Sequence, residues 1–190
     1  MFEEAIVQAF KSVPVGLESH AGFFDGWELF DFNRNEEITE VGKTEKYFYI
    51  VLEGVQAIYY ATANGDQKVI GFSFGGSFSG VYDSYLTQQP SNYCLKAITP
   101  SRLIGVRKHL YDSWFKDYPE FDRWGRLIHQ ELLIGRVQRE LELTTLSSKE
   151  RFDTFMKRCP KELMEIPQKY LASYLNMTPE TFSRLRGSIS

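Results

Sequence analysis

The apolar residues of this chain follow two patterns, and the change between them comes near Pro119. Before Pro119, short β-branched and aromatic runs are separated by turn-forming residues, as in 46–52 (KYFYIVL) and 55–62 (VQAIYYAT). Several such runs at regular spacing predict short strands and therefore a sandwich or barrel. The pair Asn64-Gly65 predicts a tight hairpin after the second run. The other elements predicted in this part are strands at 68–74, 93–98 and 103–106 and a helix at 1–13.

After Pro119 the apolar residues recur at helical spacing as far as about Thr145. The apolar stripe is wide, and its near-heptad spacing favours pairing with the same helix of a second copy. A single long core helix is the alternative interpretation. The segment 147–150 (SSKE) matches a capping box and predicts another helix at 151–158. The candidate residues of the pairing seam are Phe121, Trp124, Ile128, Ile134, Val137 and Leu141.

The segment 166–186 (IPQKYLASYLNMTPETFSRLR) predicts two short helices joined by a tight turn, as in a helix-turn-helix. Pro167 suits the first turn of the first helix, and Asn176 tolerates the left-handed conformation expected where that helix ends. Thr178 is expected to cap the second helix, with Pro179 in its first position. The side chains expected to point inward are Leu171, Ala172, Leu175, Phe182 and Leu185.

The outward side chains of the second helix can read base edges in a DNA groove. Arg184 can donate two hydrogen bonds to guanine, and Glu180, one turn earlier, can accept one from cytosine. Ser183 can bond a base or a phosphate, whereas Arg186 and Lys169 are expected to hold phosphates. An ordinary helical hairpin with a solvated charged face is the alternative. The residues predicted to contact DNA are Lys169, Thr178, Glu180, Thr181, Ser183, Arg184 and Arg186.

Composition argues against several classes of protein. With 190 residues and 43% hydrophobic content, the chain can form one large or two small domains. No apolar run is long enough to span a membrane, and the N-terminus lacks the features of a signal peptide. Cys94 and Cys159 are too few for a disulfide scaffold, so reduced thiols in a cytoplasmic protein are expected. His20, His109 and His129 are widely separated and form no metal-binding motif.

The charge is distributed unevenly along the chain. Residues 121–190 hold 12 Lys and Arg against 9 Asp and Glu, whereas the remaining residues hold 10 against 16. The basic excess therefore lies in the part that contains the helix-turn-helix, although the net charge of the whole chain is −3. This asymmetry favours a C-terminal segment that faces an anion.

The order of these elements resembles the Crp/Fnr family of bacterial transcription regulators over nearly the whole chain. The most specific match is 178–184 (TPETFSR), which is similar to the recognition-helix pattern of Glu, Ser and Arg at fixed offsets. The segment 75–80 (GGSFSG) stands where the family has its phosphate-binding cassette. The segment 52–55 (LEGV) is similar to the turn between two barrel strands.

The resemblance implies an α+β fold in three parts. Residues 1–118 would form a jelly-roll barrel like that of cyclic-nucleotide-binding domains, 119–145 a dimerisation helix, and 146–190 a helix-turn-helix domain. Most of the β wing that follows the recognition helix in the family is expected to be missing, because the sequence stops four residues past Arg186. A homodimer would bind an inverted-repeat site in double-stranded DNA.

The effector pocket departs from the family pattern. Cyclic-nucleotide-binding members carry a Gly-Glu pair that bonds the ribose and an Arg, further on, that pairs with the phosphate. Here Gly80 is followed by Val81, and Ser91, Asn92 and Tyr93 stand where the Arg is expected. Each lost contact would contribute about 1.5–3 kcal/mol to binding, so cyclic AMP is not expected to bind tightly. Any effector is therefore an unknown small molecule. The residues predicted to line the pocket are Ser79, Gly80, Val81, Tyr82, Ser91, Asn92 and Tyr93.

The chemistry of an enzyme is not evident in this sequence. It has no Ser/His/Asp arrangement, no P-loop and no closely spaced His and Glu ligands of a cupin, so no catalytic residue, metal or cofactor is predicted. Tyr82, Tyr85 and Tyr93 either line an aromatic pocket or belong to the barrel core. The predicted function is therefore a cytoplasmic, DNA-binding transcription regulator. The alternative is a regulatory ligand-binding or protein-interaction module of the same fold without specific DNA binding.

Overall fold

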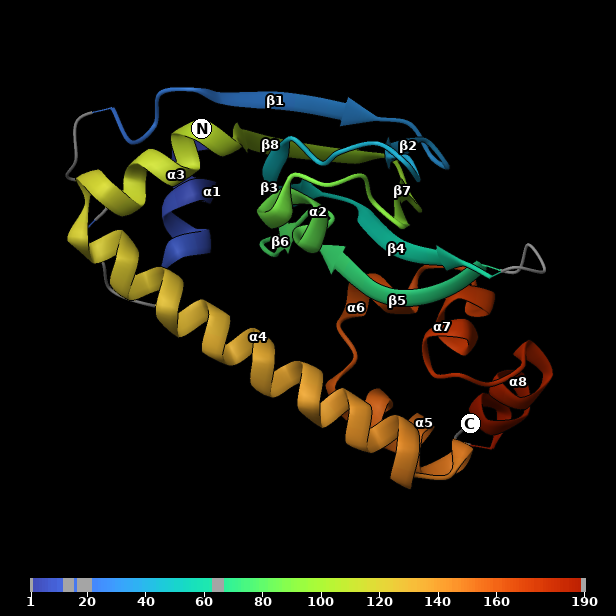
Figure 1. The fold of residues 1–190 in the computed structure, drawn as a ribbon. Coiled ribbons are helices and arrows are strands. Elements are labelled where there is room, and N and C mark those ends of the chain that lie inside the picture. The colour runs from blue at the N-terminus through green and yellow to red at the C-terminus, as the bar shows by residue number, and fades with distance from the viewer. Residues whose placement is uncertain (1, 12–15, 17–21, 63–66, 189–190) are drawn as a thin grey trace.

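The computed structural model describes residues 2–11, 16, 22–62 and 67–188. The strands form two antiparallel four-stranded sheets, in the orders β1-β8-β3-β6 and β2-β7-β4-β5 (Figure 1). This arrangement confirms the predicted combination of a β-rich N-terminal part with C-terminal helices. The strands are β1 (Trp27–Phe32), β2 (Glu37–Thr39), β3 (Tyr47–Glu53), β4 (Val55–Ala61), β5 (Gln67–Phe74), β6 (Phe78–Ser79), β7 (Tyr93–Ala97) and β8 (Ser101–Arg107).

The helices lie at one end of the barrel and below it. The longest, α4, runs away from the barrel, and α5 to α8 lie between its C-terminal end and the strands β4 and β5 (Figure 1). The helices are α1 (Phe2–Phe10), α2 (Tyr82–Thr87), α3 (Lys108–Asp117), α4 (Pro119–Thr145), α5 (Ser148–Arg158), α6 (Lys161–Met164), α7 (Gln168–Tyr174) and α8 (Pro179–Gly187).

The strands predicted from the β-branched runs are all present, as β3, β4, β5, β7 and β8. Gly54 separates β3 from β4 with a φ of 89°, and a Cβ there would lie 2.4 Å from the carbonyl oxygen of Pro100. Glycine is therefore required where these strands join. The predicted turn at Asn64-Gly65 lies outside the described residues. The strands β1, β2 and β6 and the helices α2, α3 and α6 were not predicted.

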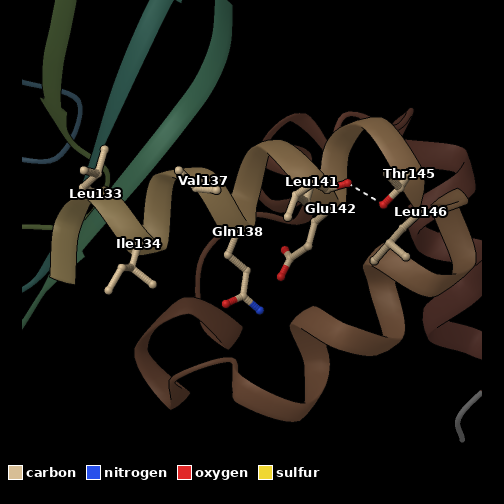
Figure 2. Close-up of a pocket in the computed structure, with 8 residues that line it drawn as sticks. All are labelled: Leu133, Ile134, Val137, Gln138, Leu141, Glu142, Thr145 and Leu146. Atoms are coloured by element: carbon tan, nitrogen blue, oxygen red, sulfur yellow. Dashed lines mark hydrogen bonds between the residues drawn. The ribbon is translucent and has the colours of Figure 1, made fainter. Parts of the chain in front are cut away.

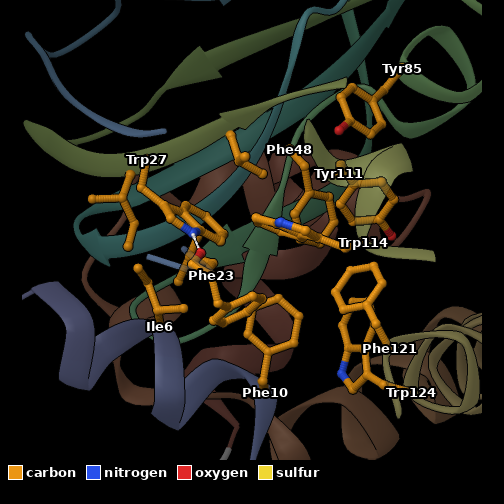
Figure 3. Packing of buried hydrophobic residues seen from close by; sticks show 13 residues of the cluster. Ile6, Phe10, Phe23, Trp27, Phe48, Tyr85, Tyr111, Trp114, Phe121 and Trp124 are labelled. Carbon is orange, nitrogen blue, oxygen red and sulfur yellow. Dashed lines mark hydrogen bonds between the residues drawn. The ribbon is translucent and has the colours of Figure 1, made fainter. Parts of the chain in front are cut away.

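One hydrophobic core joins the sheet of β1, β8 and β3 to the helices α1, α3 and the start of α4 (Figure 3). It is rich in aromatic rings: the ring of Phe10 lies 4.5 Å from that of Trp124, and Phe121 packs 5.3 Å from Trp114. Phe121 and Trp124 are 0% and 1% exposed. These two residues, which the sequence placed in a seam with a second copy, therefore belong to the core of the single chain.

The boundaries of α4 and the capping box before α5 confirm their sequence predictions, whereas α5 begins at Ser148, three residues before its predicted start. Pro119 is the first residue of α4 and Thr145 the last. At the start of α5, the Ser147 hydroxyl accepts the backbone N–H of Glu150, and the Glu150 carboxylate accepts the backbone N–H of Ser147. This reciprocal capping box satisfies two helix-end donors, as its sequence predicted.

A second core joins β4 and β5 to the C-terminal helices. Its buried members include Ala57, Tyr59 and Val69 from the sheet and Phe152 and Phe182 from α5 and α8. The helix-turn-helix is therefore packed directly on the barrel and does not have a hydrophobic core of its own. This packing sets the position of α7 and α8 relative to β4 and β5.

Candidate nucleic-acid interface

The two short helices and the tight turn predicted for 166–186 are present as α7, the turn at 175–178 and α8. Asn176 has a φ of 51°, which confirms the left-handed conformation expected at the end of the first helix. The backbone N–H of Met177 then donates to the carbonyl oxygen of Ala172 at 3.0 Å. Pro167 precedes α7 as its N-cap residue, one position before the predicted first turn.

The second helix begins as the sequence predicts. The hydroxyl of Thr178 accepts the backbone N–H of Thr181 at 3.2 Å, and Pro179 is in the first turn. On the inner side Phe182 is fully buried, with its ring 5.2 Å from that of Phe152. Capping and burial together fix the helix axis, so the outward side chains leave from a rigid support.

Glu180, Ser183 and Arg184 are exposed on α8, as expected for side chains that read bases. Glu180 and Arg184 lie four positions apart and so project from the same helical face. Hydrogen bonds from its own backbone N–H and from Thr178 lower the pKa of Glu180, which keeps it an ionised acceptor. The face therefore carries a carboxylate acceptor, a hydroxyl and a guanidinium donor. Lys169 is also exposed, near the start of α7.

Two of the residues predicted to contact DNA, Thr181 and Arg186, are less exposed than Glu180, Ser183 and Arg184. The Thr181 hydroxyl lies 3.2 Å from that of Thr178 and is half-buried as part of the cap. Arg186 is also half-buried, and it lines a hollow of about 410 Å³ together with Arg34 of the β1–β2 connection and Glu165. Arg186 is therefore on the side of α8 that borders the barrel.

The docking of α7 on the barrel was not predicted from the sequence. The backbone N–H of Val69 in β5 donates to the hydroxyl of Ser173 at 3.0 Å. The ring of Tyr170 lies 6.1 Å from Tyr59, and the ring of Tyr174 lies 5.2 Å from Phe72. The hydrogen bond gives an N–H of the edge strand β5 a partner on a helix, which no local pattern in the sequence indicates.

The long helix α4 is also attached to the helix-turn-helix. Arg139 stacks 3.6 Å from the ring centre of Tyr174 and donates to the carbonyl oxygen of the same residue. Burial lowers the pKa of this guanidinium. Farther along α4, Glu142 accepts two hydrogen bonds from Arg158 of α5, at 2.9 and 2.6 Å. The C-terminal half of α4 thus holds α5 and α7 through charged groups.

Between Leu133 and Leu141, α4 leaves a row of apolar side chains exposed (Figure 2). Ile134, Val137 and Leu141, which the sequence placed in a pairing seam, are 65%, 51% and 56% exposed. Leu133, which the sequence analysis did not include, is 66% exposed. These four residues line a groove of about 570 Å³ that ends near Leu146.

The residues predicted for the effector pocket have different surroundings. Ser79 lies in the barrel, with its hydroxyl 2.7 Å from that of Ser73. Ser91 instead bonds its own neighbour: its hydroxyl donates to the carbonyl oxygen of Tyr93 and accepts the Tyr93 N–H. Asn92 is exposed, and the Tyr93 ring lies 6.0 Å from the ring of Tyr60. Since Tyr60 is 45% exposed, Tyr93 faces the outside of the sheet.

The other two tyrosines considered for an aromatic pocket pack in the first core. Tyr85 is 1% exposed, and its ring lies 6.1 Å from that of Phe48. Tyr82 is half-buried, and its hydroxyl contacts Nε2 of His129 on α4. Tyr85 therefore belongs to the barrel core, and it does not line an aromatic pocket.

The sequence did not predict that the carboxylate of Glu45 is buried beside Val81. Glu45 is 2% exposed and precedes β3. Its oxygens accept hydrogen bonds from the backbone N–H groups of Lys46, Tyr47 and Val81 and from the hydroxyl of Thr39. Burial raises the pKa of Glu45, and these hydrogen bonds partly oppose that rise. In the sequence, Glu45 stands between Lys43 and Lys46, and such a charged segment does not indicate a buried residue.

Among the described residues, no cluster of three or more His, Cys, Asp or Glu side chains could hold a metal ion. No helix in the same residues is long and apolar enough to cross a membrane.

Residues 29–118, which include most of the barrel, match the family model of the cyclic nucleotide-binding domain. This part of the chain is therefore similar to the domains of that family. With the long helix and the helix-turn-helix included, the chain has the fold of Crp/Fnr-type regulators, as the resemblance in its sequence implied.

Three solved structures illustrate the similarity of the whole chain. FixK2 from Bradyrhizobium japonicum is 18% identical with a TM-score of 0.77, covering 86% of this chain and 84% of FixK2. A mutant of CooA from Carboxydothermus hydrogenoformans is 12% identical with a TM-score of 0.70, covering 93% of this chain and 83% of CooA. The c-di-GMP responsive global regulator CLP from Xanthomonas campestris is 13% identical with a TM-score of 0.68, covering 98% and 91%. The comparison with curated proteins gave no match.

Proposed function

We propose that this protein is a transcription regulator that binds an inverted-repeat DNA site as a homodimer and reads the sequence with α8. The observation that carries this proposal is the exposed row of Glu180, Ser183 and Arg184 on a capped helix of a helix-turn-helix. Arg184 would donate to guanine O6 and N7 and Glu180 would accept from cytosine N4. No enzymatic activity is part of the proposal.

The apolar groove on α4 supports the homodimer. Ile134, Val137 and Leu141 follow one another at spacings of three and four residues, the pattern of a two-helix seam. Parallel pairing of two α4 helices would place two α8 helices at the same end of the dimer. Because such a dimer is two-fold symmetric, its DNA target would be an inverted repeat with half-sites about one helical turn apart.

Selection of bound sequences from random duplexes tests the proposal. We expect an inverted repeat whose half-sites contain a G·C pair, since Arg184 is the principal guanine reader. Arg184→Ala should weaken binding to the selected site by about 1–3 kcal/mol and relax the preference at one base pair. Lys169→Ala should weaken binding to all sequences alike and lower the salt slope by roughly one, as for a phosphate contact, because Lys169 is exposed near the start of α7.

Arg123→Ala is a matched control, because it removes an exposed arginine from α4 at a site outside the proposed interface. It should leave both affinity and selectivity unchanged. Equal losses on selected and random DNA for Arg184→Ala would remove this residue from base reading. Recovery of no preferred sequence by the unaltered protein would favour the alternative, a ligand-binding or protein-interaction module of the same fold.

A further inference from the structure

The strongest unexplained feature of the barrel is the carboxylate of Glu45. Oε1 accepts the backbone N–H of Lys46 at 2.9 Å and that of Tyr47 at 3.2 Å. Oε2 accepts the backbone N–H of Val81 at 3.2 Å and the hydroxyl of Thr39. A carboxylate can only accept hydrogen bonds, so these donors match its ionised form. Among the described residues, no lysine or arginine pairs with this buried charge.

These hydrogen bonds reach the segment where related domains have their phosphate-binding cassette. Gly80 has a φ of 131°, and a Cβ there would lie 3.4 Å from the carbonyl oxygen of Tyr47 and 3.9 Å from Oε2 of Glu45. The backbone therefore passes close to the carboxylate, and the N–H of Val81 points at it. Val81 itself is 1% exposed.

Glu45 also holds the far end of the cassette through its own backbone. Its N–H donates to the hydroxyl of Ser84 at 3.0 Å, and that hydroxyl donates to the carbonyl oxygen of Gln89 at 2.6 Å. The amide of Gln88 donates to the carbonyl oxygen of Glu45 at 3.2 Å. One residue thus ties the start of β3 to both ends of α2.

We propose that Glu45 acts as an internal ligand of the cassette, occupying with its own carboxylate the position that an anionic effector would need. A phosphate from solution would have to share the N–H of Val81 with a buried negative charge, and like charges repel strongly at that distance. The cassette is therefore held in one conformation without a small molecule. Cyclic nucleotides then regulate neither the domain nor the DNA binding proposed above, on which this last consequence rests.

The test is chemical rescue of a cavity variant. Glu45→Ala removes the carboxylate but keeps the backbone donors of Lys46, Tyr47 and Val81. We expect this variant to be less stable than the unaltered protein and to regain stability on addition of sodium acetate, compared with sodium chloride at equal ionic strength. At an acetate concentration ten times its dissociation constant, the unfolding equilibrium constant should fall about 11-fold.

Two further variants make the rescue specific. Glu45→Gln fills the same space without the charge, so it should be destabilised and should not respond to acetate. Glu53→Ala removes an exposed carboxylate from the end of β3, so it should neither lose much stability nor respond. A folded Glu45→Ala protein that gains no more from acetate than Glu53→Ala does would overturn the proposal.

A second measurement applies even if Glu45→Ala does not fold. In the unaltered protein, the amide proton of Val81 should show the same NMR chemical shift with and without a large excess of cyclic AMP, and it should move in Glu45→Gln. A shift of this proton by cyclic AMP in the unaltered protein would overturn the proposal. Neither measurement uses DNA. A failure of the proposed DNA binding would therefore not change these results, and it would be detected in the separate selection experiment.

Discussion

Substitution of Ile134 by alanine should separate the two subunits of the proposed dimer. Ile134 lies within the exposed apolar row of α4 and is 65% exposed in the single chain. The change removes about three methyl or methylene groups, each contributing about 0.8 kcal/mol when buried. With about two-thirds of the side chain newly buried on pairing, the loss is about 1.5 kcal/mol per subunit, or about 3 kcal/mol per symmetric dimer. The dimer should therefore dissociate about 100-fold more readily.

Sedimentation equilibrium at a series of micromolar concentrations measures this change directly. Circular dichroism of each variant shows that the subunit remains folded, which we expect because Ile134 is not part of either buried core. Arg136→Ala is the control, since Arg136 is exposed on α4, projects from a different helical face than Ile134 and does not line the apolar groove. A monomer mass for the unaltered protein, or an unchanged dissociation constant for Ile134→Ala, would refute the assignment of this groove to self-association.

Three other substitutions or reactions test the packing of single residues. Trp124→Ala should lower the free energy of unfolding by about 3–5 kcal/mol in a urea titration, because Trp124 fills the core of the subunit and not the seam. Ser147→Ala should lower it by about 1 kcal/mol, since the capping box of α5 loses its acceptor. With a thiol reagent at mildly alkaline pH, Cys159 should react before Cys94, because Cys94 is 7% exposed and burial raises its pKa to about 11. Faster labelling of Cys94 would show that β7 opens.

The parts of the fold that the sequence predicts well are those fixed by local chemistry. Pro119 starts α4 because its missing N–H and fixed φ suit a first helical turn. Asn176 ends the first helix of the helix-turn-helix because it tolerates positive φ, and Thr178 caps the second through its hydroxyl. Each of these features depends on a few neighbouring residues, so it can be recognised without knowledge of the tertiary fold.

Features that depend on distant partners could not be predicted in the same way. The strand β1 carries Glu28 and Asp31 within its aromatic run, and it pairs with β8, far away in the sequence. The two residues of β6 are a strand only because Tyr49 and Ile50 of β3 pair with them. Periodicity also could not divide the apolar stripe of α4 between core and seam. Both uses need the same spacing, and only the positions of α1 and α3 distinguish them.

The packing of the helix-turn-helix on β4 and β5 connects these observations. Undocking α7 from the barrel would break the hydrogen bond from Val69 to Ser173 and expose Tyr59, which is 3% exposed in the docked form. The same helix is stacked against Arg139, which belongs to α4 but does not line the apolar groove. Since α7 contacts both the barrel and α4, a change in the position of α4 relative to the barrel would alter the orientation of α7 and α8 through side chains already in contact. The direction of the proposed reading face is therefore set by tertiary packing, whereas the choice of its candidate residues rests on the sequence of α8.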